Sequence, residues 1–311
     1  MFNDKVLLLS APLKERIWGG SYFKDVLKVT DNENPLGEMW SCSAHKEGES
    51  LITKGKFIGK ALSEVFNSNR ELFNNSTLDE FPILIKLIAT SDKLSVQVHP
   101  DDEYAKKYEN QYGKTEGWLI LDTKEDSSII VGHNAKDKED LVKYIENDDY
   151  DHLLNEIKVK VGEFYPIPSK TIHALGKNLL LLEVQQSSDV TYRFYDYHRK
   201  DKEGKERPLH VNKALEVTSF DKYDYQIKNV LKENECLVWK NNYFEVYSQK
   251  VDNEFILKNR NKDYLIVSVI EGNIKIDEEE LTLGDSFIIT SLCENLNIEG
   301  NGRIIITKSL I

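Results

Sequence analysis

The residues best suited to chemistry stand at the ends of two stretches that otherwise have the pattern of β-strands. In LSVQVH, Leu94–His99, side chains alternate between two faces, so Gln97 and His99 share one face. After a short acidic segment, Glu116 is the second residue of TEGWLIL and shares a face with Trp118. A carboxylate in such apolar surroundings needs a partner, because burying an unpaired charge is strongly unfavourable. A metal ion bound by Gln97, His99 and Glu116 would supply that partner.

A second stretch adds another imidazole. GEFYPIPSKTIHALGKN, residues 162–178, resembles the second conserved motif of the cupin β-barrels, G-x5-P-x-G-x2-H-x3-N. Its first Gly, Pro168 and His173 match that motif. It departs at Lys170, where the motif has Gly, and at Lys177, because the Asn is displaced by one position. His173 would complete the metal-binding set.

Two imidazoles, a carboxylate and an amide oxygen form a mixed nitrogen and oxygen set that suits Zn²⁺, with Fe²⁺ and Mn²⁺ as competitors. The absence of Cys ligands argues against a structural zinc site. Such a set leaves positions open for water or substrate, which is typical of a catalytic metal. The alternative is that these residues only satisfy one another inside a polar barrel.

Other polar side chains stand in strand-like sequence and have two possible roles. Arg193, in VTYRFY, is either a surface residue among aromatics or a cation placed in a cleft. Lys86, in the middle of FPILIKLIAT, is either functional or reaches the rim of the barrel along its aliphatic stem. His45 is either satisfied by the backbone or contacts substrate. His133 and His152, in polar loops, are expected to be solvated.

Composition excludes several classes of partner. The chain has 311 residues and a formal net charge of -12, so nucleic acid and anionic membrane surfaces are not expected partners. An anionic small substrate requires basic residues to converge locally.

Cys42, Cys236 and Cys293 form no CxxC pair, which favours reduced thiols in the cytoplasm. The N-terminus is expected to be a first strand rather than a signal peptide, and no apolar run approaches the roughly 20 residues that span a bilayer.

The pattern of elements predicts a mainly β protein made of two cupin-like β-barrels, a bicupin of jelly-roll type. Helices are predicted within residues 59–75, after Pro100 with Asp101 and Asp102 in the first turn, and within residues 136–149. From about residue 221, short strands follow one another with Gly and Asn turns and without His. We therefore predict a catalytic barrel with helical insertions at residues 1–225 and a smaller barrel without a metal site at residues 226–311.

The chain closely resembles the type I phosphomannose isomerases in their short bacterial form. The segments that carry the resemblance are GEMWSCSAH, FPILIKLIATSDKLSVQVHPDDEYA, GKTEGWLIL, IPSKTIHALGKNLLLLEVQQSSDVTYRFYDYHR and LTLGDSFII. QVHPDDEYA and QQSSDVTYRFYDYHR are the most specific. The resemblance implies a cupin fold, one zinc ion per chain, and interconversion of mannose 6-phosphate and fructose 6-phosphate.

Where the motifs match, the resemblance implies functional roles for two groups of residues. The zinc ligands are Gln97, His99, Glu116 and His173, and the active-site arginine is Arg193. Aldose–ketose isomerisation passes through an enediol, whose negative charge a permanently charged guanidinium can stabilise.

The identity of the base stays open. Lys114 would act as a base if a nearby cation lowered its pKa, or it would bind phosphate, for which Arg199 and Lys93 are further candidates. Gly117 replaces a bulkier residue of many relatives, which leaves the shape of the pocket open there.

Two other functions are compatible with the same residues. One is a sugar-phosphate sensor without turnover, and the other is a cupin oxygenase with a two-His, one-carboxylate iron centre. The expected partner is a small sugar phosphate, with a monomer and a homodimer both possible.

Overall fold

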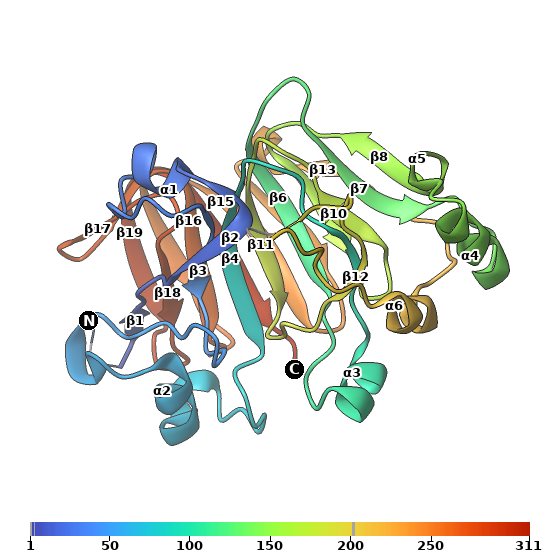
Figure 1. Cartoon of the computed structure of the whole chain (residues 1–311). Helices are drawn as coiled ribbons and strands as arrows, with labels where there is room; N and C mark the ends of the chain where they lie inside the picture. The colour runs from blue at the N-terminus through green and yellow to red at the C-terminus, as the bar shows by residue number, and fades with distance from the viewer. Residues whose placement is uncertain (1, 3, 201–202) are drawn as a thin grey trace.

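The middle of the protein is a seven-stranded antiparallel sheet, here called the central sheet, with further layers on both faces (Figure 1). The computed structural model describes residues 2, 4–200 and 203–311. In spatial order the central sheet consists of β13 (Lys228–Asn229), β9 (Glu163–Ile167), β6 (Glu116–Thr123), β11 (Leu179–Gln186), β4 (Ile83–Thr90), β3 (Leu36–Cys42) and β2 (Leu13–Gly20).

The central sheet explains the long apolar runs in the sequence. Every residue of β4 and β11 is buried, because both faces of these strands are covered. Ile85 packs toward the C-terminal strands in a core that includes Val246 and Ile305. Ile88 packs in the opposite direction, in a core with Leu175. The charged residues within these two strands are therefore also inside the protein.

A five-stranded sheet, here called the small sheet, covers one face of the central sheet. Its order is β12 (Tyr192–Tyr195), β5 (Val96–Val98), β10 (His173–Leu175), β7 (Ser128–His133) and β8 (Leu154–Lys158). Val96 and Val98 point to its outer face, where they share a core with Leu141, Leu153 and Ala214. Those three residues belong to helices α4 (Lys138–Glu146), α5 (Tyr150–Leu153) and α6 (Val211–Val217), which lie on this side of the molecule (Figure 1).

The other face of the central sheet packs against the C-terminal sheet, which has seven strands. They are β1 (Val6–Leu8), β14 (Glu235–Lys240), β15 (Phe244–Lys258), β16 (Leu265–Ile276), β17 (Glu279–Leu281), β18 (Ser286–Ile289) and β19 (Asn295–Ser309). The predicted first strand is confirmed as β1. It pairs with β18, so the beginning of the chain adds a strand to a sheet that residues 235–309 otherwise form.

The predicted helical segments are confirmed. Residues 59–75 contain α2 (Leu62–Ser68) and the 3₁₀ helix η2 (Arg70–Phe73), and α4 lies within residues 136–149. Helix α3 (Asp102–Tyr108) follows Pro100, and the Asp101 side chain caps it by accepting a hydrogen bond from the backbone N–H of Tyr104. The remaining short elements are α1 (Tyr22–Asp25), η1 (Gly55–Phe57) and η3 (Val230–Lys232).

The mainly β class is confirmed by these three sheets. The two-barrel arrangement is not confirmed, because strand pairing within the described residues gives open sheets, and it stays a prediction together with the boundary after residue 225. Among the described helices, none has the length and apolar character needed to cross a membrane.

Candidate active site

Three of the predicted metal ligands meet between the central sheet and the small sheet. His99 directly follows β5, Glu116 begins β6 and His173 begins β10, and each of the three is at most 1% exposed. Their ligand atoms all lie within 4.8 Å of one another. The two Nε2 atoms are 3.1 Å apart, and each lies 3.5 Å from an oxygen of Glu116.

The tautomers of both imidazoles follow from their backbone partners. Nδ1 of His99 lies 2.8 Å from the carbonyl oxygen of Val190, and Nδ1 of His173 lies 2.8 Å from that of Thr171. A carbonyl only accepts, so both Nδ1 atoms carry the proton. Burial lowers the pKa of His173 to about 4, and burial followed by the charge of Lys114 lowers that of His99. Both rings are therefore neutral at pH 7, with Nε2 lone pairs directed at one small volume.

The carboxylate of Glu116 has no aligned hydrogen-bond donor. Neither of its oxygens accepts a hydrogen bond, although the ammonium of Lys114 lies 3.0 Å from Oε2. Burial and the charge of Glu183 raise the pKa of Glu116 to about 7, while Lys114 and Lys86 oppose the rise. Two lone pairs and a carboxylate that face one another in a buried site are what a divalent cation requires, so these residues fit a metal.

Lys114 lies beside this set and is itself buried. Its Nζ also donates to Nε2 of His99 at 3.1 Å. Burial works against its charge, but the charges of Glu116 and Glu183 raise its pKa above the ordinary value. In this arrangement Lys114 is a cation, and its predicted role as base or binding residue stays a prediction.

Gln97 lies in the row of residues that crosses the small sheet. It pairs with His173 on one side and with Arg193 on the other. Directly paired residues of antiparallel strands point to the same face, so Gln97 faces the metal-binding set. Its role as fourth ligand stays a prediction.

A cavity of about 430 Å³ opens next to this set, and Gln97 and Lys114 line it. Among the described residues, its cationic lining side chains are Arg16, Lys86, Lys114, Arg193 and Arg207, and its carboxylates are Glu38, Glu183 and Asp189. Basic residues thus converge here although the whole chain is acidic, as an anionic substrate requires.

Arg193 is a cleft cation and not a surface residue. It lines the cavity, and burial lowers the pKa of its guanidinium, followed by the charge of Arg207. Its Nη1 donates to the carbonyl oxygen of Pro208 at 2.8 Å, while its buried Nε makes no hydrogen bond.

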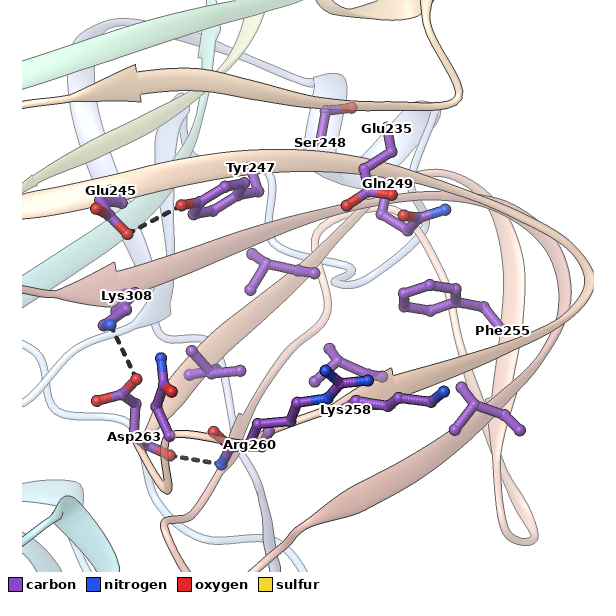
Figure 2. A pocket seen from close by; sticks show the side chains of 16 residues that line it. Glu235, Glu245, Tyr247, Ser248, Gln249, Phe255, Lys258, Arg260, Asp263 and Lys308 are labelled. Carbon is purple, nitrogen blue, oxygen red and sulfur yellow. Dashed lines mark hydrogen bonds and ion pairs between the residues drawn. The ribbon is translucent and has the colours of Figure 1, made fainter.

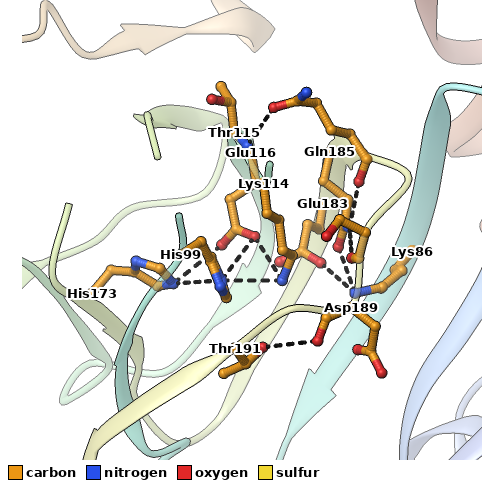
Figure 3. A network of polar contacts seen from close by, with 12 residues as sticks. Lys86, His99, Lys114, Thr115, Glu116, His173, Glu183, Gln185, Asp189 and Thr191 are labelled. Carbon is orange, nitrogen blue, oxygen red and sulfur yellow. Dashed lines mark hydrogen bonds and ion pairs between the residues drawn. The ribbon is translucent and has the colours of Figure 1, made fainter. Parts of the chain in front are cut away.

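Lys86 takes part in a second buried network on the wall of the cavity (Figure 3). Its Nζ lies 2.9 Å from Oε1 of Glu183 and 2.6 Å from Oε1 of Gln185. The indole Nε1 of Trp118 donates to the other oxygen of Glu183 at 3.0 Å. The interpretation that Lys86 reaches the rim is wrong, because Lys86 is only 4% exposed and its ammonium group pairs inside the protein.

Sequence reasoning missed Glu183. It lies in LLLLEVQQ, within β11, and it pairs with Lys86 across β11 and β4. A carboxylate within an apolar run was the signal that could have identified it.

Several other predicted roles are corrected or confirmed. His133 is not solvated, because it is half-buried and its Nε2 lies 2.9 Å from the carbonyl oxygen of Ser219. His152 is exposed, as expected. His45 is satisfied by the backbone, since its Nδ1 accepts a hydrogen bond from the N–H of Glu47 at 3.3 Å.

Three further residues lie away from the cavity wall. Neither Arg199 nor Lys93 is among the described residues that line this cavity. Gly117 has no effect on its shape, because a side chain there would point at Phe164 and Trp239, on the opposite face of the central sheet.

A larger cavity of about 630 Å³ lies on the C-terminal sheet (Figure 2). Several of its polar groups pair with one another: Lys308 lies 2.9 Å from Asp263, and the hydroxyl of Tyr247 donates to Glu245 at 3.0 Å. The smaller cavity is distinguished by its buried cations and by the set of His99, Glu116 and His173 beside it, so we place the candidate chemistry there.

Comparison with known proteins gives matches over both parts of the chain. The family model for the catalytic domain of type I phosphomannose isomerase matches residues 6–117, and that for the cupin domain of mannose-6-phosphate isomerase matches residues 234–309. The mannose-6-phosphate isomerase ManA of Bacillus subtilis is 40% identical over 97% of this chain and 98% of its own length. The mannose-6-phosphate isomerase of Streptococcus mutans is 37% identical, with the same coverage.

Solved structures show the same fold. The crystal structure of the mannose 6-phosphate isomerase from Bacillus subtilis superposes with a TM-score of 0.87 at 36% sequence identity, over 97% of this chain and 99% of the other. The apo form of the enzyme from Salmonella typhimurium gives a TM-score of 0.74 at 16% identity, which shows likeness of fold alone.

Proposed function

The chain belongs to the type I phosphomannose isomerase family, and we propose that it interconverts mannose 6-phosphate and fructose 6-phosphate by aldose–ketose isomerisation. The observation that carries the proposal is the buried set of His99, Glu116 and His173 beside a cavity rich in cations. The full-length relatives that are named mannose-6-phosphate isomerases support the choice of substrate.

The metal we propose is one zinc ion per chain. His99, Glu116 and His173 would hold it, with the amide oxygen of Gln97 as fourth ligand. When bound, zinc supplies a Lewis acid that polarises the oxygens of the sugar. The neutral state of both imidazoles favours this assignment, because a protonated ring cannot ligate a metal.

The protein's own residues would stabilise the charge that develops during the reaction. Moving a proton between C1 and C2 through an enediol places negative charge on a sugar oxygen. Arg193 would face that charge while staying protonated, because a guanidinium does not lose its proton near neutral pH. Lys114, held as a cation by two carboxylates, would donate hydrogen bonds to the substrate in preference to abstracting a proton.

We further propose a division of the chain into two cupin-like units, residues 1–225 and 226–311. The separate matches to the catalytic-domain and cupin-domain models support it, and so does the distinct C-terminal sheet. The pairing of β1 with β18 would tie the first unit to the second.

We propose a cytoplasmic enzyme, monomeric or homodimeric, whose partner is a sugar phosphate. The three free cysteines suit a reducing compartment.

A coupled assay for fructose 6-phosphate tests the function directly. Zinc-loaded protein should form fructose 6-phosphate from mannose 6-phosphate, a chelator should stop the reaction, and added zinc should restore it. Binding of mannose 6-phosphate without any product would favour a sensor. Stoichiometric iron with oxygen consumption would favour an oxygenase.

A further inference from the structure

Three arginines gather around one buried carboxylate beside the cavity. Asp196, 4% exposed, directly follows β12. Arg207 binds it with two parallel hydrogen bonds of 2.7 Å, from Nε to Oδ2 and from Nη2 to Oδ1. Arg199 binds the same carboxylate from the other side, with its Nε 3.2 Å from Oδ1. Arg193 lies close enough for its pKa to be lowered by the charges of Arg207 and Arg199, after the larger effect of burial.

This cluster carries more positive charge than its carboxylates compensate. Asp196 is shared by Arg199 and Arg207. Among the described residues, the only other carboxylate that forms an ion pair with any of the three arginines is Asp92, 3.4 Å from Arg199. Arg193 has no carboxylate partner of its own, and its buried Nε lacks an acceptor. Grouped guanidinium groups with unused donors are a typical binding site for a phosphate or carboxylate.

The unused donor of Arg207 can be assigned. Its Nε and Nη2 are both held by Asp196, and within the described residues Nη1 makes no hydrogen bond. Arg207 also lines the cavity. The carboxylate of Asp196 therefore fixes the plane of this guanidinium and leaves one charged N–H edge for a ligand.

The position of the cluster matches the length of the substrate. His173, Gln97 and Arg193 follow one another across β10, β5 and β12, and neighbouring strands lie about 4.8 Å apart. The backbone of Arg193 is therefore about 10 Å from that of His173. A hexose 6-phosphate that presents C1 and C2 to the metal-binding set carries its phosphate at the opposite end of the sugar, toward Arg207, which lies near enough to Arg193 for its charge to act on it.

We infer that Arg207 binds the phosphate dianion of the substrate, and that Asp196 is the positioning residue that orients it. The inference rests on the proposed function for the identity of the sugar phosphate, but not for the binding of an anion. The inference assigns two functions to different residues of one cavity, namely contact with the reacting carbons and binding of the phosphate. Lys114 contacts Glu116 and Gln97 pairs with His173, so both would face the reacting carbons, and Arg207, which also lines the cavity, would bind the phosphate.

Inorganic phosphate is the probe for a first test on the full-length, zinc-loaded protein. It should bind the unaltered protein in calorimetry and compete with mannose 6-phosphate. Arg207→Ala should weaken phosphate binding about 10- to 100-fold, the range expected for losing charge-assisted hydrogen bonds. The matched control is Arg260→Ala, an exposed arginine on the C-terminal sheet cavity, which should change nothing. Phosphate affinity that is unchanged in Arg207→Ala overturns the inference.

Kinetics supply the second test and separate positioning from a structural role. Arg207→Ala should raise KM for mannose 6-phosphate at least about tenfold with a much smaller change in kcat, and Asp196→Asn should raise KM by less. Zinc content should stay at one per chain in both. An Asp196→Asn variant that loses thermal stability and kcat without a selective rise in KM contradicts the positioning role. Phosphate binding that depends on Arg207 in a protein without isomerase activity would defeat the proposed function and leave the anion site standing.

Discussion

Replacing Lys86 with methionine should be among the most destabilising single changes in the protein. Lys86 and Glu183 are each 5% exposed at their side chains, and their charged atoms lie 2.9 Å apart. Methionine preserves most of the length and volume of the side chain, so the loss comes from the missing charge. Glu183 would keep only the hydrogen bond from Trp118. Removing one partner of a buried ion pair typically costs about 3–5 kcal/mol.

The pKa of Glu183 reflects the same environment. Burial by itself would raise that pKa, but the charges of Lys86 and Lys114 lower it from 4.5 to about 2. At about 1.4 kcal/mol per pKa unit, the whole shift corresponds to about 3–4 kcal/mol, which Lys86 shares with Lys114 and with the hydrogen bond from Trp118. Because the folded pKa lies below the unfolded one, this stability is present above pH 4.5 and is lost as the pH falls toward 2.

Urea unfolding of Lys86→Met, Glu183→Gln and the double variant would measure the interaction free energy between Lys86 and Glu183. The double variant buries no unpaired charge, so its loss of unfolding free energy should be smaller than the sum of the two single losses by at least about 1 kcal/mol. Lys138→Met, at an exposed position of α4, is the control and should stay within about 0.5 kcal/mol of the unaltered protein. A loss below about 1 kcal/mol for Lys86→Met, or strictly additive losses, would refute the reasoning.

Three further substitutions test the cavity and the sheets around it. Arg193→Ala should lower kcat by roughly 10²- to 10³-fold with one zinc retained per chain, and unchanged turnover would remove Arg193 from the chemistry. His99→Ala should abolish stoichiometric zinc in metal analysis; a fully metallated, active variant would contradict the ligand assignment. Gly117→Ala would place a Cβ 2.4 Å from Phe164, so the free energy of unfolding should fall by about 1–3 kcal/mol while KM stays constant. A lowered KM with full stability would instead restore the view that position 117 shapes the pocket.

Local sequence was sufficient to predict the candidate metal ligands, because the alternation of side chains between two faces is a property of a single strand. The spacing of Gln97 and His99 fixes their common face, and the turn motif before His173 fixes where its strand begins. The pairing of Gln97 with His173 brings β5 and β10 together, whereas the approach of Glu116 depends on how the central sheet packs on the small sheet.

The rest of the site depends on registers that no local pattern contains. Glu183 became identifiable only when β11 paired with β4 and placed it opposite Lys86. Arg207 stands in a loop whose own sequence gives no reason to distinguish it from neighbouring charges, and its binding to Asp196 is a contact between segments 11 residues apart. The pairing of β1 with β18 spans nearly the whole chain. Such contacts are set by the packing of sheets, which hydrophobic period alone does not specify.

The candidate ligands come from two different sheets, so the packing of these sheets determines the geometry of the site. Glu116 comes from the central sheet, whereas His99 and His173 come from the small sheet. The backbone carbonyls of Val190 and Thr171 orient the two rings, and Trp118 packs edge-on against His173 with ring centroids 5.4 Å apart. The positions of these candidate ligands are therefore set by how the two sheets pack, and their ring orientations are set by carbonyls of the segments that precede β10 and β12. The burial of His99, Glu116 and His173, each at most 1% exposed, also gives their charges and dipoles a stronger effect than they would have at the surface.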